Sequence, residues 1–152
     1  MYRIKDIGMA PQGREKIDWV KEHMPVLNKV KKELEEEKTF KDRVIAICLH
    51  LEAKTAYMAE VFQAGGADVY ISGSNPLSTD DTVCAALAEE GIHVYSWYGI
   101  DAGSYHKNLN TLVEAQPDVI IDDGGDLTSL LHSEKRNITS VRGACEETTT
   151  GI

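Results

Sequence analysis

The sequence predicts a three-layer α/β domain with a doubly wound, mostly parallel β-sheet. Short apolar runs rich in β-forming residues alternate with helical stretches, and successive strand candidates start about 25 residues apart. That spacing leaves room for a crossover helix but is too long for a hairpin turn, so neighbouring strands should be parallel. The runs are apolar on both faces, as at residues 44–49, so helices must cover both sides of the sheet.

The elements can be assigned in chain order. Apolar residues between Asp18 and Lys38 recur at spacings of three and four, which is typical of an amphipathic helix. Five strands are then expected at residues 43–49, 67–71, 92–97, 118–121 and 138–141. Helices are expected between them at residues 55–63, 79–90, 104–115 and 127–133. Several end before a glycine or proline: Gly65, Gly91 and Pro117.

Length and composition limit the class of protein. The chain has 152 residues, and about 150 residues make one domain, so a single core is expected. We divide it into an N-terminal helical segment, residues 1–40, and an α/β domain, residues 41–152, on which that segment packs. The 16 Lys and Arg against 25 Asp and Glu give a net charge of −9. An acidic surface repels phosphate backbones, so nucleic acid is not an expected partner.

The location and the cysteine chemistry follow from simple patterns. No apolar run approaches the roughly 18 residues of a membrane span, and the first ten residues lack the apolar segment of a secretory signal. A cytoplasmic protein without a membrane partner is therefore expected. The cysteines, Cys48, Cys84 and Cys145, form no CxxC pair, so neither a zinc site nor a disulfide framework is expected.

Polar and glycine-containing segments follow four of the five predicted strands. Ligands of open parallel sheets bind outside the carboxyl ends of the strands, so this edge should be a small-molecule crevice. The segments are His50 with Glu52 and Lys54, then residues 72–81, 122–126 and 145–151. A histidine such as His50 can exchange a proton near neutral pH when a carboxylate holds it, although a structural histidine is equally compatible with the position.

The acidic segment at residues 122–126 has three interpretations. Asp126 could cap the helix that starts at Leu127, with Gly124 and Gly125 supplying the turn. The carboxylates could instead hold a cation such as magnesium, or one of them could contact ligand hydroxyls or assist proton transfer. We favour capping for Asp126 and ligand contact for Asp123, with no metal site.

Three threonines, Thr148, Thr149 and Thr150, offer several hydroxyl donors near the end of the chain. Such a run suits a polar ligand edge such as ribose or phosphate, although it is also compatible with a plain surface loop. The sequence contains neither GxGxxG nor GxxxxGK[ST], so it carries neither of these phosphate cradles itself.

Several motifs resemble those of one enzyme family. They are DIG at residues 6–8, GR at 13–14, MP at 24–25, CLH at 48–50, ST at 78–79, DDGGDLT at 122–128, RG at 142–143 and EETTTG at 146–151. With these motifs the chain resembles the N-terminal part of S-adenosylhomocysteine hydrolase. The resemblance covers essentially the whole chain but roughly the first third of the family's length, and DDGGDLT and EETTTG are highly specific.

The resemblance implies an incomplete, Rossmann-like substrate-binding domain of a methyl-cycle enzyme in one-carbon metabolism. Such enzymes reversibly hydrolyse a nucleosidyl thioether of homocysteine, with a tightly held NAD as internal oxidant. Oxidation of the 3′-hydroxyl acidifies the C4′ proton, homocysteine leaves by elimination, water adds, and the ketone is reduced again. The family also implies a homotetramer.

The resemblance implies individual roles as well. His50 resembles the family's acid/base histidine, and Asp123 resembles its carboxylate partner near the reacting sugar. Glu147 resembles the residue that binds the ribose hydroxyls. Thr148, Thr149 and Thr150 resemble the run that touches NAD.

Two positions of the substrate site depart from the family pattern. Most members carry a threonine and then a glutamate near the purine amino group, where this chain has Glu52 and Lys54. An ammonium group can only donate, so Lys54 suits the O6 of a hypoxanthine better than an amino group. Our hypothesis from this one difference is an inosine-like purine, so the expected substrate is either S-adenosyl-L-homocysteine or S-inosyl-L-homocysteine. Asp80, often a glutamine in the family, is a smaller change.

The NAD-binding domain of the family, with its GxGxxG motif and the lysine and aspartate that act at the 3′-hydroxyl, is absent from this sequence. We therefore expect no homocysteine release from the chain alone. The alternative is a stand-alone nucleoside-binding or regulatory module without catalysis. A flavodoxin-like or receiver-type domain fits the strand rhythm but leaves the threonine run unexplained.

Overall fold

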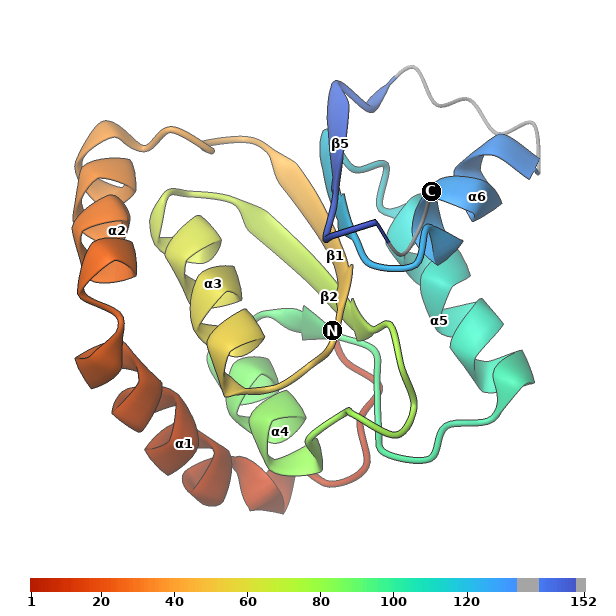
Figure 1. Cartoon of the computed structure of the whole chain (residues 1–152), viewed down its shortest axis with the longest axis horizontal. Coiled ribbons are helices and arrows are strands. Elements are labelled where there is room, and N and C mark those ends of the chain that lie inside the picture. The colour runs from red at the N-terminus through yellow and green to blue at the C-terminus, as the bar shows by residue number, and fades with distance from the viewer. Residues whose placement is uncertain (134–139, 150–152) are drawn as a thin grey trace.

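The computed structural model describes residues 1–133 and 140–149 and contains one five-stranded, all-parallel sheet (Figure 1). The strand order is β3-β2-β1-β4-β5. The strands are β1 (Val44–Leu49), β2 (Asp68–Gly73), β3 (His93–Val94), β4 (Val119–Asp122) and β5 (Gly143–Glu146). The predicted fold class is confirmed. None of the helices in the described ranges is long and apolar enough to cross a membrane.

Helices cover both faces of the sheet, as the apolar strands require. The helices are α1 (Ala10–His23), α2 (Pro25–Glu37), α3 (Ala53–Ala64), α4 (Asp81–Glu89), α5 (Ala102–Glu114) and α6 (Asp126–Ser133). Figure 1 shows α1 to α4 on one side and α5 and α6 on the other. In β1, Ile45 and Ile47 pack into the cluster formed with α1, α3 and α4, whereas Ala46 and Cys48 pack with α5 and α6.

The strand order places a topological switch point between β1 and β4. The chain leaves β1 for β2 and β3 on one side, then crosses back to lay β4 against the other side of β1. The loops after β1 and β4 therefore diverge, and an open parallel sheet binds ligands in the crevice between such loops. His50 follows β1 and Asp123 follows β4, so both lie at this crevice.

The N-terminal helical region consists of two helices, so the prediction of a single helix over residues 18–38 is wrong. Helix α1 begins at Ala10, and Met24 leaves the helical conformation at φ −121° and ψ 64°. The following Pro25 is the cause, because proline disfavours helical backbone in the preceding residue and lacks the amide that would continue the helix.

Helix α1 lies very close to α4 and is tied to α3. A Cβ atom on Gly13 would lie 1.9 Å from the carbonyl oxygen of Thr82, so only glycine fits at this crossing. The buried carboxylate of Glu60 accepts from Arg14 at 2.6 Å and from Lys21 at 2.9 Å. The N-terminal region therefore packs directly on the α/β domain.

The fifth strand lies later in the chain than predicted. It spans Gly143–Glu146, whereas the apolar run at residues 138–141 lies partly outside the described residues, and its last two residues are not in a strand. Val141 packs against the cluster under α5 and α6, so its apolar character serves packing. Strand β5 is an edge strand with mostly exposed residues, and no apolar pattern marks it.

Replacing Asp118 by Asn should reduce stability at neutral pH by about 1 kcal/mol, because Asp118 has two hydrogen-bond donors and one further ion-pair partner. They are the amide of Val44 at 2.9 Å, Arg43 at 3.0 Å and Arg142 at 3.4 Å. The Val44 hydrogen bond, followed by those two arginines, holds the pKa of Asp118 below its usual value.

A lowered pKa in the folded state means that this contribution is complete above the unfolded-state pKa of about 3.9. It is lost as the pH falls through the folded-state pKa. Urea unfolding at pH 7 and pH 3 should show that the difference between the variant and the parent chain shrinks at pH 3. An equal difference at both pH values would contradict this account; exposed Glu114→Gln is the control.

Candidate active site

Hydrogen bonds hold the backbone on both sides of His50, at the carboxyl end of β1. The amide of Ser74 donates to the carbonyl of Leu49 at 2.8 Å, and the amide of Asp80 donates to the carbonyl of Leu51 at 2.9 Å. The loop between β2 and α4 is thus fastened to the chain on both sides of His50. The imidazole itself remains 50% exposed, so it faces the crevice.

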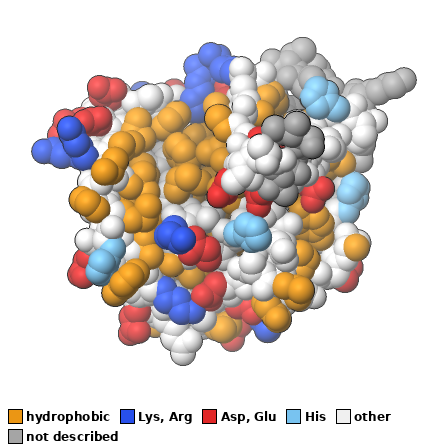
Figure 2. Space-filling model, viewed as in Figure 1, with side chains coloured by type: hydrophobic (Ala, Val, Ile, Leu, Met, Phe, Trp, Pro, Cys, Tyr) orange, Lys and Arg blue, Asp and Glu red, His pale blue; other side chains and the backbone are white. Residues whose placement is uncertain are grey.

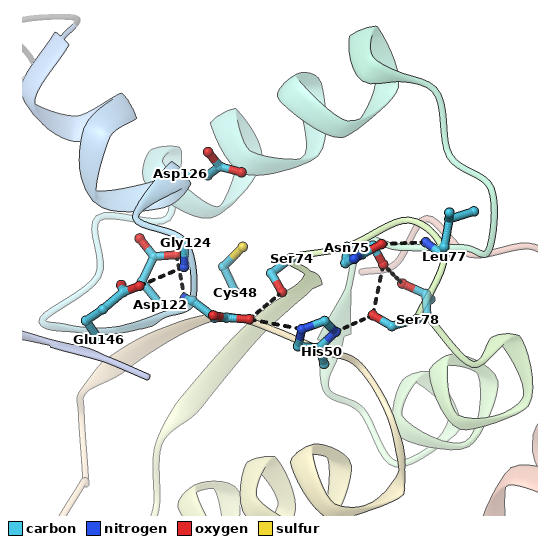
Figure 3. Close-up of polar contacts among 12 residues, drawn as sticks. Cys48, His50, Ser74, Asn75, Leu77, Ser78, Asp122, Gly124, Asp126 and Glu146 are labelled. Atoms are coloured by element: carbon cyan, nitrogen blue, oxygen red, sulfur yellow. Dashed lines mark hydrogen bonds and ion pairs between the residues drawn. The ribbon is translucent and has the colours of Figure 1, made fainter. Parts of the chain in front are cut away.

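Both nitrogens of the His50 ring have partners from other strand ends. Nδ1 lies 2.5 Å from Oγ of Ser78, and Nε2 lies 3.2 Å from Oδ2 of Asp123. Ser74 donates to the same carboxylate oxygen at 3.1 Å. Figure 3 shows His50 between Ser74 and Ser78. Asp123 is only 10% exposed, so the structure joins the predicted histidine, which faces solvent, to a largely buried carboxylate.

The loop after β4 is organised by Asp122 and not by Asp126. The buried carboxylate of Asp122 accepts from the amides of Asp123 at 3.1 Å and Thr128 at 2.8 Å. The prediction that Asp126 caps a helix starting at Leu127 is wrong, because α6 begins at Asp126 itself and the Asp126 side chain accepts from the Tyr105 hydroxyl at 2.9 Å. Gly124 has φ +90° and its amide donates to Glu146 at 2.7 Å, which joins this loop to β5 (Figure 3).

Beneath this loop lie the uncharged side chains of Cys48 and Tyr105. The thiol of Cys48 lies 3.7 Å from the Tyr105 hydroxyl, and burial raises the pKa of both groups well above neutral pH. Burial also raises the pKa of Cys84, so neither thiol is a thiolate nucleophile. Within residues 1–133 and 140–149, no group of three or more His, Cys, Asp or Glu is arranged to hold a metal ion.

A groove of about 630 Å³ opens between α2, α3 and the ends of β4 and β5, and Leu49, which precedes His50, is part of its lining. Apolar side chains line most of it: Met24, Val26, Leu27, Val30, Leu49, Met58, Ile121 and Cys145. Figure 2 shows such side chains gathered over this part of the surface. Its polar lining is Glu52, Lys54, Thr55, Glu146 and Glu147. Apolar walls with a few polar groups suit a flat ring system with polar edges.

Glu52 and Lys54, which both line the groove, differ in the contacts that they make. Oε1 of Glu52 caps α3 by accepting from the amides of Lys54 at 3.2 Å and Thr55 at 3.3 Å. The ammonium group of Lys54 makes no ion pair or hydrogen bond with any residue that the structure describes, and its side chain is exposed. It can therefore reach a ligand in the groove.

The C-terminal candidates lie at the same edge of the sheet. The amide of Glu147 donates to the carbonyl of Asp122 at 2.8 Å, which fixes Glu147 beside the acidic loop. Thr148 and Thr149 follow with exposed side chains, and Thr150 lies outside the described residues. The structure thus places His50, Asp123 and Glu147 at one edge.

Sequence reasoning missed Ser74, Ser78 and Asp122 as parts of the site. The polar loop at residues 72–81 was recognised, but a loop sequence does not indicate which hydroxyl faces a histidine on another strand. The one available signal was that two consecutive aspartates cannot both point into the crevice. Of the two, Asp122 is the buried one.

The comparisons with known proteins identify a family for this chain. The family described as S-adenosyl-L-homocysteine hydrolase matches residues 1–150. The S-inosyl-L-homocysteine hydrolase of Methanocaldococcus jannaschii is 50% identical over 100% of this chain and 37% of its own length. The S-inosyl-L-homocysteine hydrolase of Methanothermobacter thermautotrophicus is 48% identical, over 99% of this chain and 36% of its own length.

The adenosylhomocysteinase of Pyrococcus abyssi is 49% identical, over 99% of this chain and 36% of its own length. The chain therefore spans little more than a third of the curated relatives, and it aligns over nearly all of its own residues. A profile match over this range and identities near one half leave no other assignment. The chain belongs to the S-adenosyl-L-homocysteine hydrolase family.

Proposed function

We propose that this chain forms the N-terminal, substrate-binding part of an enzyme that reversibly hydrolyses a nucleosidyl thioether to nucleoside and homocysteine. The observation that carries the proposal is the contact between His50 and Asp123 beside an apolar groove. We call the longer polypeptide, in which a cofactor-binding domain follows this chain, the complete enzyme. Its cytoplasmic location and its assembly as a tetramer stay predictions.

His50 and Asp123 are the proposed acid/base pair. Nε2 of His50 and Oδ2 of Asp123 are 3.2 Å apart at the crevice, so the carboxylate can hold the protonated Nε2 of the imidazole. Oδ1 of Asp123 has no hydrogen-bond partner among the described residues, so it is available to a substrate hydroxyl. Glu147 has the acceptors needed to bind ribose hydroxyls.

The exposed hydroxyls of Thr148 and Thr149 fit contact with one polar edge of NAD. Bound NAD would supply the reversible oxidation of the substrate's 3′-hydroxyl. The chain has no glycine-rich phosphate cradle, so we place the greater part of the cofactor's site in the other domain of the complete enzyme. On this proposal the chain alone does not release homocysteine.

We propose hypoxanthine as the purine. Hypoxanthine offers a donor at N1 and an acceptor at O6, whereas adenine offers an acceptor at N1 and a donor amino group. The carboxylate of Glu52 and the ammonium group of Lys54 complement the hypoxanthine order. The names of the Methanocaldococcus and Methanothermobacter relatives agree with an inosyl substrate.

The complete enzyme should turn over S-inosylhomocysteine with a kcat/KM at least about tenfold above that for S-adenosylhomocysteine, since one charge-assisted hydrogen bond contributes about 1.5–3 kcal/mol. Lys54→Glu should reduce or invert this preference, because a carboxylate accepts from an amino group and repels O6. Homocysteine release with each substrate measures the ratio.

The matched control is Lys107→Glu, the same charge reversal at an exposed position on α5, which should leave the substrate ratio unchanged. A strong preference of the unmodified enzyme for the adenosyl substrate would remove the hypoxanthine proposal. Absence of homocysteine release from both substrates would remove the hydrolase proposal.

A further inference from the structure

We propose that Ser78 is a positioning residue that holds the His50 imidazole in one orientation in both of its protonation states. The inference deepens the proposed function and rests on it for the catalytic role of His50. It starts from the hydroxyl oxygen of Ser78, which lies 2.5 Å from Nδ1 of His50.

The two ring nitrogens have partners of different chemistry. An ionised carboxylate can only accept, so Asp123 requires a proton on Nε2 of His50. Nδ1 is then the nitrogen that gains or loses a proton when the ring changes its charge. Its partner must accept from the charged ring and donate to the neutral ring, and a hydroxyl group is able to do both.

Ser78 has a second acceptor that makes this exchange possible. Its hydroxyl lies 3.2 Å from the carbonyl oxygen of Asn75. With a neutral ring, the hydroxyl proton of Ser78 points at Nδ1 of His50. With a charged ring, Nδ1 donates to Ser78 and the hydroxyl proton turns to Asn75. Each polar atom keeps a partner in both protonation states, so neither state favours a different orientation of the imidazole ring.

The loop that carries Ser78 is held in place independently of this contact. Oδ1 of Asn75 accepts from the amide of Leu77 at 2.8 Å, and the Thr79 hydroxyl donates to the Asn75 carbonyl at 3.3 Å. The ends of the loop are fastened to the carbonyls on either side of His50, as described above. Ser78 therefore reaches His50 from a backbone that need not move, and only a hydroxyl rotation is required (Figure 3).

The test begins with the ¹⁵N-labelled chain and the resonances of the His50 ring. In the parent chain the neutral ring should carry its proton on Nε2, with the Nδ1 resonance displaced toward that of a hydrogen-bonded acceptor. Ser78→Ala should shift the Nδ1 resonance and leave the amide spectrum dispersed. Ser78→Thr keeps the hydroxyl group and should restore the parent resonance.

Ser78→Cys retains the size of the side chain with a much weaker hydrogen-bonding group, so it should resemble Ser78→Ala. It separates loss of the hydrogen bond from loss of packing. Ser133→Ala, at a serine whose hydroxyl donates to the Leu130 carbonyl, should leave the His50 resonances unchanged.

In the complete enzyme, Ser78→Ala should lower kcat about tenfold with KM changed less than about twofold, and Ser78→Thr should recover most of the loss. An unchanged Nδ1 resonance in the folded Ser78→Ala chain would overturn the inference, as would equal losses of kcat in the alanine and threonine variants. The resonance does not depend on turnover, so an inactive parent enzyme would refute the proposed function without deciding the role of Ser78.

Discussion

Replacing Asp123 by Asn is expected to lower the kcat of the complete enzyme by about 100-fold or more, the range that a positioned acid/base group contributes. The amide oxygen of asparagine can still accept from Ser74, so the loop should keep its conformation. An amide carries no charge and takes up no proton, however, so it does not hold Nε2–H of His50 as the carboxylate does and cannot act as an acid or base toward the substrate. Homocysteine release measures kcat, and thermal unfolding shows whether the fold survives.

The same substitution elsewhere supplies the control for Asp123→Asn. Asp101 accepts from the amide of Ser104 at 2.9 Å as the cap of α5, and it is not among the residues that line the groove. Asparagine caps helices about as well as aspartate, so Asp101→Asn should leave kcat unchanged. A loss smaller than about tenfold for Asp123→Asn, with its fold intact, would show that Asp123 is no part of an acid/base pair.

Replacing Gly13 by Ala is expected to destabilise the chain by about 3 kcal/mol, at the upper end of the cost of overpacking. The new Cβ would lie 1.9 Å from the oxygen and 2.4 Å from the carbon of the Thr82 carbonyl. These atoms belong to backbone, so α1 must move away from α4. The direction of the stability change is informative, because at an exposed position inside a helix alanine is more favourable than glycine by about 1 kcal/mol.

Urea unfolding of the chain at neutral pH measures the effect of Gly13→Ala. Gly143→Ala is the matched control, because a Cβ atom there meets nothing within 4 Å, and a change below about 0.5 kcal/mol is expected. A Gly13→Ala chain as stable as the parent would mean that α1 and α4 are not packed as closely as the structure shows.

The sheet and its functional edge could be predicted because both depend on local signals. Strand β1 is apolar on both faces and ends at a polar histidine, so periodicity alone located it. The rule that parallel strands carry ligands at their carboxyl ends then placed His50 and Asp123 at one crevice. Their contact needed only the further fact that β4 pairs with β1.

The errors arose where a residue's role depends on a distant partner. Pro25 ends a helix that apolar spacing alone would continue. Strand β5 is defined by its pairing with β4 and has little apolar content of its own, so the apolar Val141 was assigned to it instead. Asp122 and Asp126 belong to the same acidic, glycine-containing segment, and only the packed structure shows which one holds the backbone.

The switch point between β1 and β4 also orders the events by which the proposed acid/base pair comes into being. During synthesis the ribosome releases β1, β2 and β3 first, so a nascent chain of that length carries His50 and Ser78 but not Asp123. The carboxylate arrives only when β4 pairs with the remaining free side of β1. The capacity for proton exchange therefore appears only after the long-range pairing of β4 with β1, and a nascent chain that ends before β4 does not possess it.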